Sequence, residues 1–294
     1  MKFAYGYEII DYCNVNHRTL HEVSLAFEIE KTGRSYGYIR DYLKQVLKVM
    51  NQAVQAGIND TEDKIKGKII GNDSVLMKKR MDTSRTVCGE TIAKAVAYAL
   101  STMEVNASMG KVVASPTAGS CGVLPAVLMT TKERFNLTEE DLLEGLLAAN
   151  MIGTIVARNA TIAGAEGGCQ AEVGTASAMA SGAVVHMMGG TPEQVFNAAS
   201  MCFKNLLGLV CDPIAGLVES PCAKRNGMGA ANALMCAEMS LAGIKSVIPF
   251  DEVVEAMYRI GKSLPPSLRE TSLGGLATTK TGIQINTELF GQKK

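Results

Sequence analysis

Residues 209–232 read LVCDPIAGLVESPCAKRNGMGAAN, and the rest of the chain is organised around this stretch. Cys211 and Cys222 each stand close to a proline, and a basic pair follows the second cysteine directly. Pro213 and Pro221 disfavour one continuous helix through the segment, so both thiols are expected on irregular backbone near helix ends. Backbone of this kind leaves amide groups free to bond an anion.

The composition carries no strong electrostatic or aromatic signature. The 294 residues include 29 basic and 29 acidic side chains, so the formal net charge is zero. We therefore expect no nucleic acid partner and no membrane partner, and a small neutral or zwitterionic ligand fits better. Tryptophan is absent, and aromatic residues make up 5% of the chain. Together with many alanines and glycines, this is typical of close-packed helices, and we predict an all-α fold.

The chain has no linker that would divide it, so we predict one large helical domain over residues 1–294. A helical N-terminal part, residues 1–72, is expected to pack on a core of residues 73–294. Small residues fill the stretch after Cys169, residues 170–183. A helix with such a surface lets neighbouring backbones approach closely, so we expect it at the centre of the fold.

Apolar residues spaced by three and four predict two amphipathic helices within residues 19–57, broken around Thr32 and Gly33. Residues 59–72 are polar and predict a loop. The chain is expected to end in a Gly/Thr-rich tail. Further helices are predicted over residues 84–103, 142–157 and 252–262.

Two capping sequences mark helix starts. Thr138 with Asp141 resembles a capping box, and Thr191 with Gln194 forms a clearer one that has proline at the first helical position. Pro125 is expected to kink or delay the helix that contains it.

The N-terminus MKFAYGYEIIDYC lacks the apolar core and cleavage site of a secretory signal, so we expect a cytoplasmic protein. The longest apolar run, residues 142–157, contains Glu144, Gly145 and Asn150 and is too short to span a bilayer. Eight cysteines without a signal indicate reduced thiols and not a disulfide framework.

The segment GKVVASPTAGSCG, residues 110–122, presents several hydroxyl groups and glycines just before an apolar run. Hydroxyls and free amides at a helix start are suited to holding a carboxylate or phosphate. An ordinary turn and helix cap is the alternative interpretation of the same residues.

Cys169 is a third thiol at a loop-to-helix junction, directly after Gly167 and Gly168. The helix dipole and free amides favour a thiolate there. The chain has no C-x2-C pair, which disfavours a structural zinc site. Three cysteines around a [4Fe-4S] cluster would leave one iron without a protein ligand, and an open iron can act as a Lewis acid. Free cysteines that are merely small buried hydrophobic residues are the alternative.

Four stretches carry a resemblance to a known family. They are SPTAGSCGVLPAVL (residues 115–128), GAEGGCQAEVGTASAMA (164–180), LGLVCDPIAGLVESPCAKRNGMGAANA (207–233) and GKSLPPSLRETSLGGLA (261–277). Together they closely resemble the α chain of iron-sulfur-dependent L-serine dehydratase, and a weaker likeness begins near residue 9. Several long motifs in the same order make the resemblance specific.

The resemblance implies a [4Fe-4S] cofactor with Cys169, Cys211 and Cys222 as its ligands. The fold that it implies is an all-helical catalytic domain with irregular cysteine-bearing loops. It also implies that the SPTAGS segment binds the substrate carboxylate, and the residues so assigned are Ser115, Thr117, Ala118, Gly119 and Ser120.

The reaction implied is the elimination of water from L-serine, which yields pyruvate and ammonia, with the open iron activating the leaving hydroxyl. The same iron would also suit L-threonine dehydration or L-cysteine desulfhydration, and a non-catalytic helical subunit is a further alternative. Single-chain members of the family carry an additional domain that nothing here resembles, so a separate β chain is implied as partner. Whether the chain also forms a homo-oligomer is left open.

Lys224 and Arg225 are our candidate catalytic residues, because they directly follow a proposed ligand. They would compensate the charge of the cluster or bind the substrate carboxylate, and a solvated basic pair is the alternative. Of the three histidines, His186 is interpreted as a core residue. His17 and His21 are expected on one helix face, where they could be surface or site residues, and the surface interpretation is favoured. The base that removes the α-proton is not assigned.

The five remaining cysteines are not expected to be ligands. Cys121 adjoins the proposed carboxylate site and could line its cavity. The other four are interpreted as core or surface thiols in helices, and they are Cys13, Cys88, Cys202 and Cys236.

Overall fold

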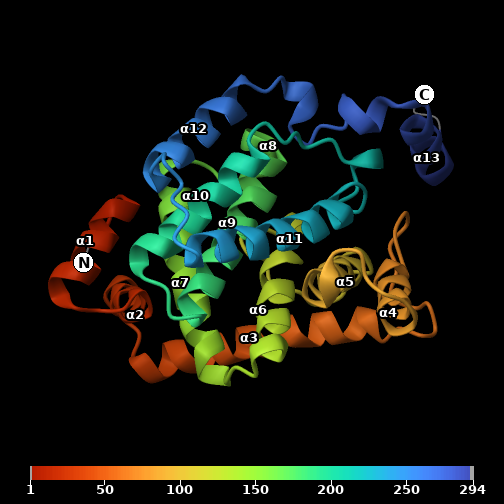
Figure 1. The fold of residues 1–294 in the computed structure, drawn as a ribbon. Coiled ribbons are helices and arrows are strands. Elements are labelled where there is room, and N and C mark those ends of the chain that lie inside the picture. The colour runs from red at the N-terminus through yellow and green to blue at the C-terminus, as the bar shows by residue number, and fades with distance from the viewer. Residues whose placement is uncertain (1, 292–294) are drawn as a thin grey trace.

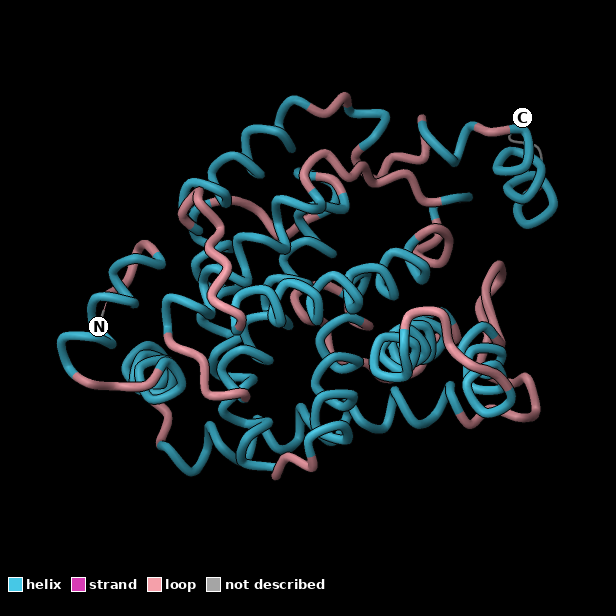
Figure 2. The backbone as a smooth tube through the Cα atoms, viewed as in Figure 1, coloured by secondary structure: helices cyan, strands magenta, loops and turns pink. Residues whose placement is uncertain are grey.

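The computed structural model describes residues 2–291 (Figures 1 and 2). Within this range the chain forms thirteen α-helices and no strand. Its β pairing consists of two isolated bridges. The prediction of an all-α fold is therefore confirmed. None of these helices is both long and apolar enough to cross a bilayer. The α-helices are α1 (Gly6–Asn16), α2 (Leu20–Thr32), α3 (Tyr36–Ile58), α4 (Asp73–Thr83), α5 (Gly89–Ala107), α6 (Val123–Phe135), α7 (Glu139–Asn159), α8 (Gly164–Gly167), α9 (Cys169–Met187), α10 (Pro192–Leu206), α11 (Cys222–Leu241), α12 (Phe250–Ser263) and α13 (Lys280–Phe290).

Helix α9 lies at the centre of the molecule and packs against α6, α7, α10 and α11 (Figure 1). Every residue from Cys169 to Val185 is buried. A Cβ atom added at Gly182 would come within 2.2 Å of Cδ1 of Ile152 on α7. The small residues therefore set how closely the neighbouring helices approach, and the predicted central position of this helix is confirmed.

One hydrophobic cluster joins helices from both halves of the chain. Its buried members include Ile9 on α1, Val54 on α3, Ile152 on α7 and Met257 on α12. The helices of the N-terminal part thus share a core with the helices that follow. The division of residues 1–294 at residue 72 stays a prediction, and residues 1 and 292–294 lie outside the described range.

The predicted break between the first two amphipathic helices is confirmed. Helix α2 ends at Thr32, and Gly33 follows with a φ of 66°, a left-handed conformation that favours glycine. Ser35 then begins α3, because its side-chain oxygen accepts a hydrogen bond from the backbone N–H of Tyr38 at 3.3 Å.

Both predicted capping boxes are formed. The Asp141 amide donates to Thr138 Oγ1 at 3.2 Å, and the Thr138 amide donates to Asp141 Oδ2 at 2.7 Å. The Gln194 amide likewise donates to Thr191 Oγ1 at 3.3 Å, and the Thr191 amide donates to Gln194 Oε1 at 2.9 Å. Helices α7 and α10 therefore begin where local sequence places them.

Helix α4 has no counterpart among the predicted helices. Its first turn is anchored by the buried carboxylate of Glu104, which belongs to α5. Glu104 Oε1 accepts from the Asp73 amide at 2.6 Å and from the Ser74 amide at 3.2 Å, and Oε2 accepts from the Ser74 hydroxyl. Because this stabilisation comes from a residue distant in sequence, the local pattern of α4 does not reveal it.

Two predicted helix starts and the predicted C-terminal tail need correction. The helix predicted from residue 84 begins at Gly89, whose φ of 75° marks a left-handed turn. The helix predicted from residue 252 begins at Phe250, and the Gly/Thr-rich tail contains α13. Thr279 caps α13 by accepting a hydrogen bond from the Gly282 amide at 3.1 Å, so a threonine of the tail starts a helix.

Pro125 does not kink α6, contrary to expectation. The helix begins at Val123, which places the proline at its third position. The first N–H groups of a helix have no intrahelical acceptor, so a proline there removes no hydrogen bond.

Gly57→Ala should lower the midpoint of thermal unfolding. A Cβ atom at Gly57 would lie 2.5 Å from Ser101 Oγ and 2.8 Å from Ser101 O, so α3 and α5 would have to separate. We expect a loss of about 1–3 kcal/mol from such overpacking. Gly37→Ala on the same helix is the control, because a Cβ atom there meets nothing within 4 Å. Equal losses in the two variants would contradict the close approach of α3 and α5.

Candidate active site

Two buried cysteines, Cys169 at a helix start and Cys211 in an irregular loop, approach one another, and a third buried cysteine, Cys222, is not part of that close group. Cys169 is the first residue of α9 and Cys222 is the first residue of α11. Cys211 lies in the loop before the 3-10 turn η2 (Ile214–Gly216). The Sγ atoms of Cys169 and Cys211 and a carboxylate oxygen of Glu172 all lie within 4.8 Å of one another.

The thiols differ in their tendency to ionise. A hydrogen bond with Cys211 and the Arg225 guanidinium lower the pKa of Cys169, although burial acts in the opposite direction. The same hydrogen bond and burial raise the pKa of Cys211. Burial, followed by the charges of Cys169 and Glu172, raises the pKa of Cys222 to about 12. Of the three thiols, Cys169 therefore ionises most readily, and Cys211 is the one placed to donate a hydrogen bond to it.

Backbone hydrogen bonds hold the Cys211 loop on two sides. The Cys211 amide donates to Leu268 O at 2.9 Å, and Cys211 O accepts from the Glu270 amide at 2.7 Å. On the other side the Gln170 amide donates to Leu209 O at 3.0 Å. The loop is thus held between the start of α9 and residues 268–270, and the predicted irregular backbone around this cysteine is confirmed.

Two glycines allow α8 and the start of α9 to press against the loop. Gly168 has a φ of 76°, and a Cβ atom there would lie 2.7 Å from Leu209 O. A Cβ atom at Gly164 would lie 2.5 Å from Glu172 Oε2 and 3.2 Å from Cys211 Sγ. Any larger side chain at these positions would push into the cysteine site.

The structure separates the two candidate catalytic residues, Lys224 and Arg225. Arg225 Nη1 donates to Cys169 Sγ at 3.4 Å and to Val210 O at 2.8 Å, and Nη2 pairs with Asp212 Oδ1 at 2.8 Å. The Arg225 and Asp212 side chains are only 13% and 4% exposed. Lys224 points away from the thiols and pairs with Asp73 at the start of α4. Of the basic pair, only the arginine reaches the cysteines.

The SPTAGS segment lies beside the same carboxylate that faces the thiols. Thr117 Oγ1 donates to Glu172 Oε1 at 2.8 Å. Ala118, Gly119 and Ser120 form the 3-10 turn η1, and a Cβ atom at Gly119 would lie 3.2 Å from Glu172 Oε1. The structure thus brings the predicted carboxylate-binding segment and two of the predicted ligands together around Glu172.

Asn226, one turn into α11, fixes the position of the SPTAGS segment. Its Nδ2 donates to Gly119 O at 2.8 Å and to Cys222 O at 2.9 Å, and its Oδ1 accepts from the Gly122 amide at 3.0 Å. Ser115 is buried at the other end of the segment, with its hydroxyl 3.4 Å from Val113 O. One amide side chain therefore ties the segment to a predicted ligand.

The family model described as serine dehydratase alpha chain matches residues 16–277 of this chain. The chain belongs to the serine dehydratase alpha chain family. The probable L-serine dehydratase alpha chain of Bacillus subtilis (strain 168) is 46% identical over 284 residues, which cover 97% of this chain and 94% of that protein. The L-serine dehydratase alpha chain of Peptoniphilus asaccharolyticus is 46% identical over 283 residues, covering 96% and 97%.

Longer proteins in the serine dehydratase family also match. L-serine dehydratase TdcG of Escherichia coli (strain K12) is 35% identical over 276 residues, which cover 92% of this chain and 60% of that protein. The chain therefore corresponds to part of the longer protein and to nearly the full length of the alpha chains.

Glu172 is a residue of this candidate site that the sequence analysis missed. Its side chain is buried, and burial raises its pKa to about 7 even though Thr117 donates a hydrogen bond to it. The available signal was its spacing, because residues i and i+3 share a helix face and Glu172 stands three positions after Cys169. The small residues around Glu172 indicated only that this helix packs closely against its neighbours.

A second buried carboxylate, Glu219, ties the cysteine loop to a distant segment. It accepts hydrogen bonds from the amides of Lys68 (3.1 Å), Ile69 (2.6 Å) and Ile70 (3.1 Å). A Cβ atom at Gly67 would lie 2.3 Å from Glu219 Oε2. The loop between the second and third cysteines is thus joined to the connection between α3 and α4.

The remaining cysteines and histidines are not part of the group formed by Cys169, Glu172 and Cys211. Cys121 is buried against Met103 Sδ at 3.7 Å, in a small hydrophobic cluster that also contains Cys222. His21 and His186 contact each other, and His17 is exposed. Among the other thiols Cys88 is exposed, and the buried ones are Cys13, Cys202 and Cys236.

Arg225→Met should destabilise the metal-free chain far more than Lys224→Met. The first change leaves Asp212 buried without its cation, which typically costs about 3–5 kcal/mol. The second removes an exposed pair that is worth about 1 kcal/mol or less. Thermal and urea unfolding of the metal-free proteins measure both losses. Similar losses in the two variants would show that the arginine is not held as described.

Proposed function

We propose that this chain is the α chain of a two-chain, [4Fe-4S]-dependent L-serine ammonia-lyase, which eliminates water from L-serine to give pyruvate and ammonia. Family membership and the names of the relatives support the reaction. The observation that carries the proposal is the meeting of buried thiols, a buried arginine and the SPTAGS segment at one place. We also propose that the enzyme is cytoplasmic.

The donor set of the site fits an iron-sulfur cluster. Cys169, Cys211 and Cys222 would hold it, because they are buried sulfur ligands and two of them start helices, where free amides stabilise negative charge. When bound, a cluster with three protein ligands supplies one open iron, a Lewis acid that activates the serine hydroxyl as leaving group.

Arg225 would offset the negative charge of the thiolates. Its guanidinium contacts Cys169 Sγ, and Asp212 and Val210 O fix its orientation. Asp212 is itself held by the Leu276 amide, which donates to its Oδ2 at 2.8 Å. The arginine thus keeps Cys169 ready to bind a cation, while Lys224, paired with Asp73, lies outside this arrangement.

The substrate carboxylate would be held by residues 115–120. The backbone amides of Ala118 and Gly119 would supply neutral donors, as a zwitterionic amino acid requires. The hydroxyls of Ser115, Thr117 and Ser120 each donate within the chain in this structure, so each would exchange that hydrogen bond for one to the substrate. Glu172 accepts from the Thr117 hydroxyl and would hold it in place until the substrate binds.

Neither His186 nor His21 is placed to act as the base for the α-proton, and we propose that a partner chain supplies this base. His186 stands seventeen positions after Cys169 on one helix, which separates them by about 25 Å. His21 contacts His186 and therefore lies equally far from the thiols. The longer relatives match this chain over only part of their length. We propose that the β chain corresponds to the part of those relatives that this chain does not match, and that it would complete the site.

Iron and sulfide content after anaerobic reconstitution tests the ligands. Cys169→Ala, Cys211→Ala and Cys222→Ala should each lose most of the iron and the sulfide-to-iron charge-transfer absorbance. Cys88→Ala is the matched control, because this thiol is exposed and should leave iron binding unchanged. Full iron content in all three variants would rule out this ligand set and favour the non-catalytic helical subunit.

Thr117→Val should raise KM for L-serine about 10-fold to 100-fold when the holoenzyme is assayed with its β chain, because a lost bond to a charged group costs about 1.5–3 kcal/mol. Iron content should not change, and Thr117→Ser should recover most of the affinity. Release of pyruvate from serine, 2-oxobutyrate from threonine and sulfide from cysteine identifies the substrate. Faster sulfide release from cysteine than pyruvate release from serine would overturn the proposed reaction.

A further inference from the structure

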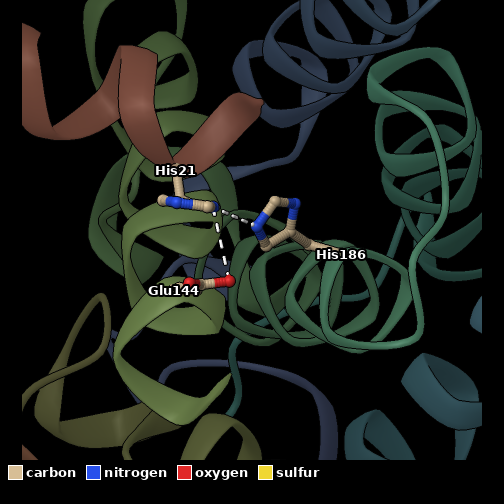
Figure 3. Close-up of side chains that lie close together, drawn as sticks. All are labelled: His21, Glu144 and His186. Carbon is tan, nitrogen blue, oxygen red and sulfur yellow. Dashed lines mark hydrogen bonds and ion pairs between the residues drawn. The ribbon is translucent and has the colours of Figure 1, made fainter. Parts of the chain in front are cut away.

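A second group of ligating side chains lies at the other end of α9 (Figure 3). It consists of His21 from α2, Glu144 from α7 and His186 from α9, whose ligating atoms all lie within 4.8 Å of one another. His21 Nδ1 lies 2.9 Å from His186 Nε2 and 3.4 Å from Glu144 Oε2. The three side chains come from three helices and point toward one place (Figure 3).

Protons alone satisfy this group poorly. A single proton between His21 Nδ1 and His186 Nε2 forms one hydrogen bond between the two rings. The Glu144 carboxylate then receives no hydrogen bond from His186. Among residues 2–291, His21 is the ion-pair partner of Glu144. Burial, followed by the charge of His21, lowers the pKa of His186 to about 4, so this ring is neutral at pH 7 and has a lone pair to offer.

A metal ion would satisfy all three lone pairs at once. Ligand atoms about 2.0–2.2 Å from a tetrahedral zinc ion lie about 3.3–3.6 Å apart. The observed separations of 2.9 Å and 3.4 Å are close to these values, so small side-chain movements would seat the ion. Two imidazoles and one carboxylate form a ligand set that binds Zn²⁺ and related divalent transition metals.

The surroundings leave room for a further ligand and favour a cation. His21 and Glu144 line a hollow of about 430 Å³, which has room for a water molecule as a further ligand. His186 lies in the last turn of α9, where the helix dipole favours positive charge. The rings meet nearly edge to face, with centroids 5.1 Å apart, so neither ring blocks the other's nitrogen.

We propose that His21, Glu144 and His186 bind a divalent transition-metal ion of the zinc class, separate from the cysteine site. The ion would join α2 and α7 to the end of α9, with water from the hollow as its fourth ligand. Because its ligands come from three helices, binding should stabilise the folded chain, and the stabilisation should increase with the logarithm of the metal concentration above Kd. The site does not depend on the proposed lyase reaction.

Anomalous scattering from crystals of the full-length chain soaked in ZnCl2 locates the ion directly. Data collected on both sides of the zinc absorption edge should show a peak between His21 Nδ1, Glu144 Oε2 and His186 Nε2. The method separates this ion from zinc at the cysteines, which lie at the far end of α9. A peak at the cysteines alone, or no peak at all, would overturn the proposal.

Equilibrium dialysis against Zn²⁺ tests the site in solution. Glu144→Gln and His186→Gln should each bind one zinc ion fewer than the unmodified chain, and should lose its zinc-dependent rise in unfolding temperature. His17→Gln is the matched control, because this exposed histidine lies outside the group, and it should bind as the unmodified chain does. Unfolding without metal verifies that the variants fold. Equal zinc content in all four proteins, or Mg²⁺ competing as well as Zn²⁺, would contradict a site built on imidazole nitrogen.

Discussion

The close packing of helices around α9 is the constraint on which the rest of the structure depends. Glycine, alanine and serine side chains let α6, α7, α10 and α11 contact this helix, and even one added carbon at Gly182 would collide with Ile152. A helix buried on all sides cannot tilt or slide without disturbing its neighbours. Whatever projects from its two ends is therefore fixed relative to the whole core. Cys169 stands at one end and His186 stands at the other.

The cysteine site combines this rigid helix with backbone that no helix could supply. Cys211 has to leave regular structure in order to reach Cys169, and its amide and carbonyl are satisfied by residues 268–270 instead. The buried negative charge near Cys169 needs a cation that cannot move away. Arg225 fulfils this need because Asp212 holds it, and the Leu276 amide holds Asp212 in turn. Along this series of hydrogen bonds, each polar group is held in position by the next one.

Local patterns predicted much of the fold, since helix periodicity and capping boxes are properties of neighbouring residues. The cysteines and the SPTAGS segment could also be singled out from the sequence. Other features depend on packing that sequence does not reveal. Lys224 and Arg225 differ by about 100° around one helix, and only the packing of α11 decides which of them faces the thiols. Helix α4 was not predicted, because the carboxylate that anchors its first turn, Glu104, lies on another helix.

The three amides bound by Glu219 connect the buried cysteine loop with the surface of the molecule. Glu219 stands between Cys211 and Cys222, while the amides belong to residues 68–70, which are partly at the surface. Because the two segments share hydrogen bonds, a displacement of the cysteine loop would also displace residues 68–70. The connection between α3 and α4 is thus a part of the protein surface that is mechanically coupled to the cysteines.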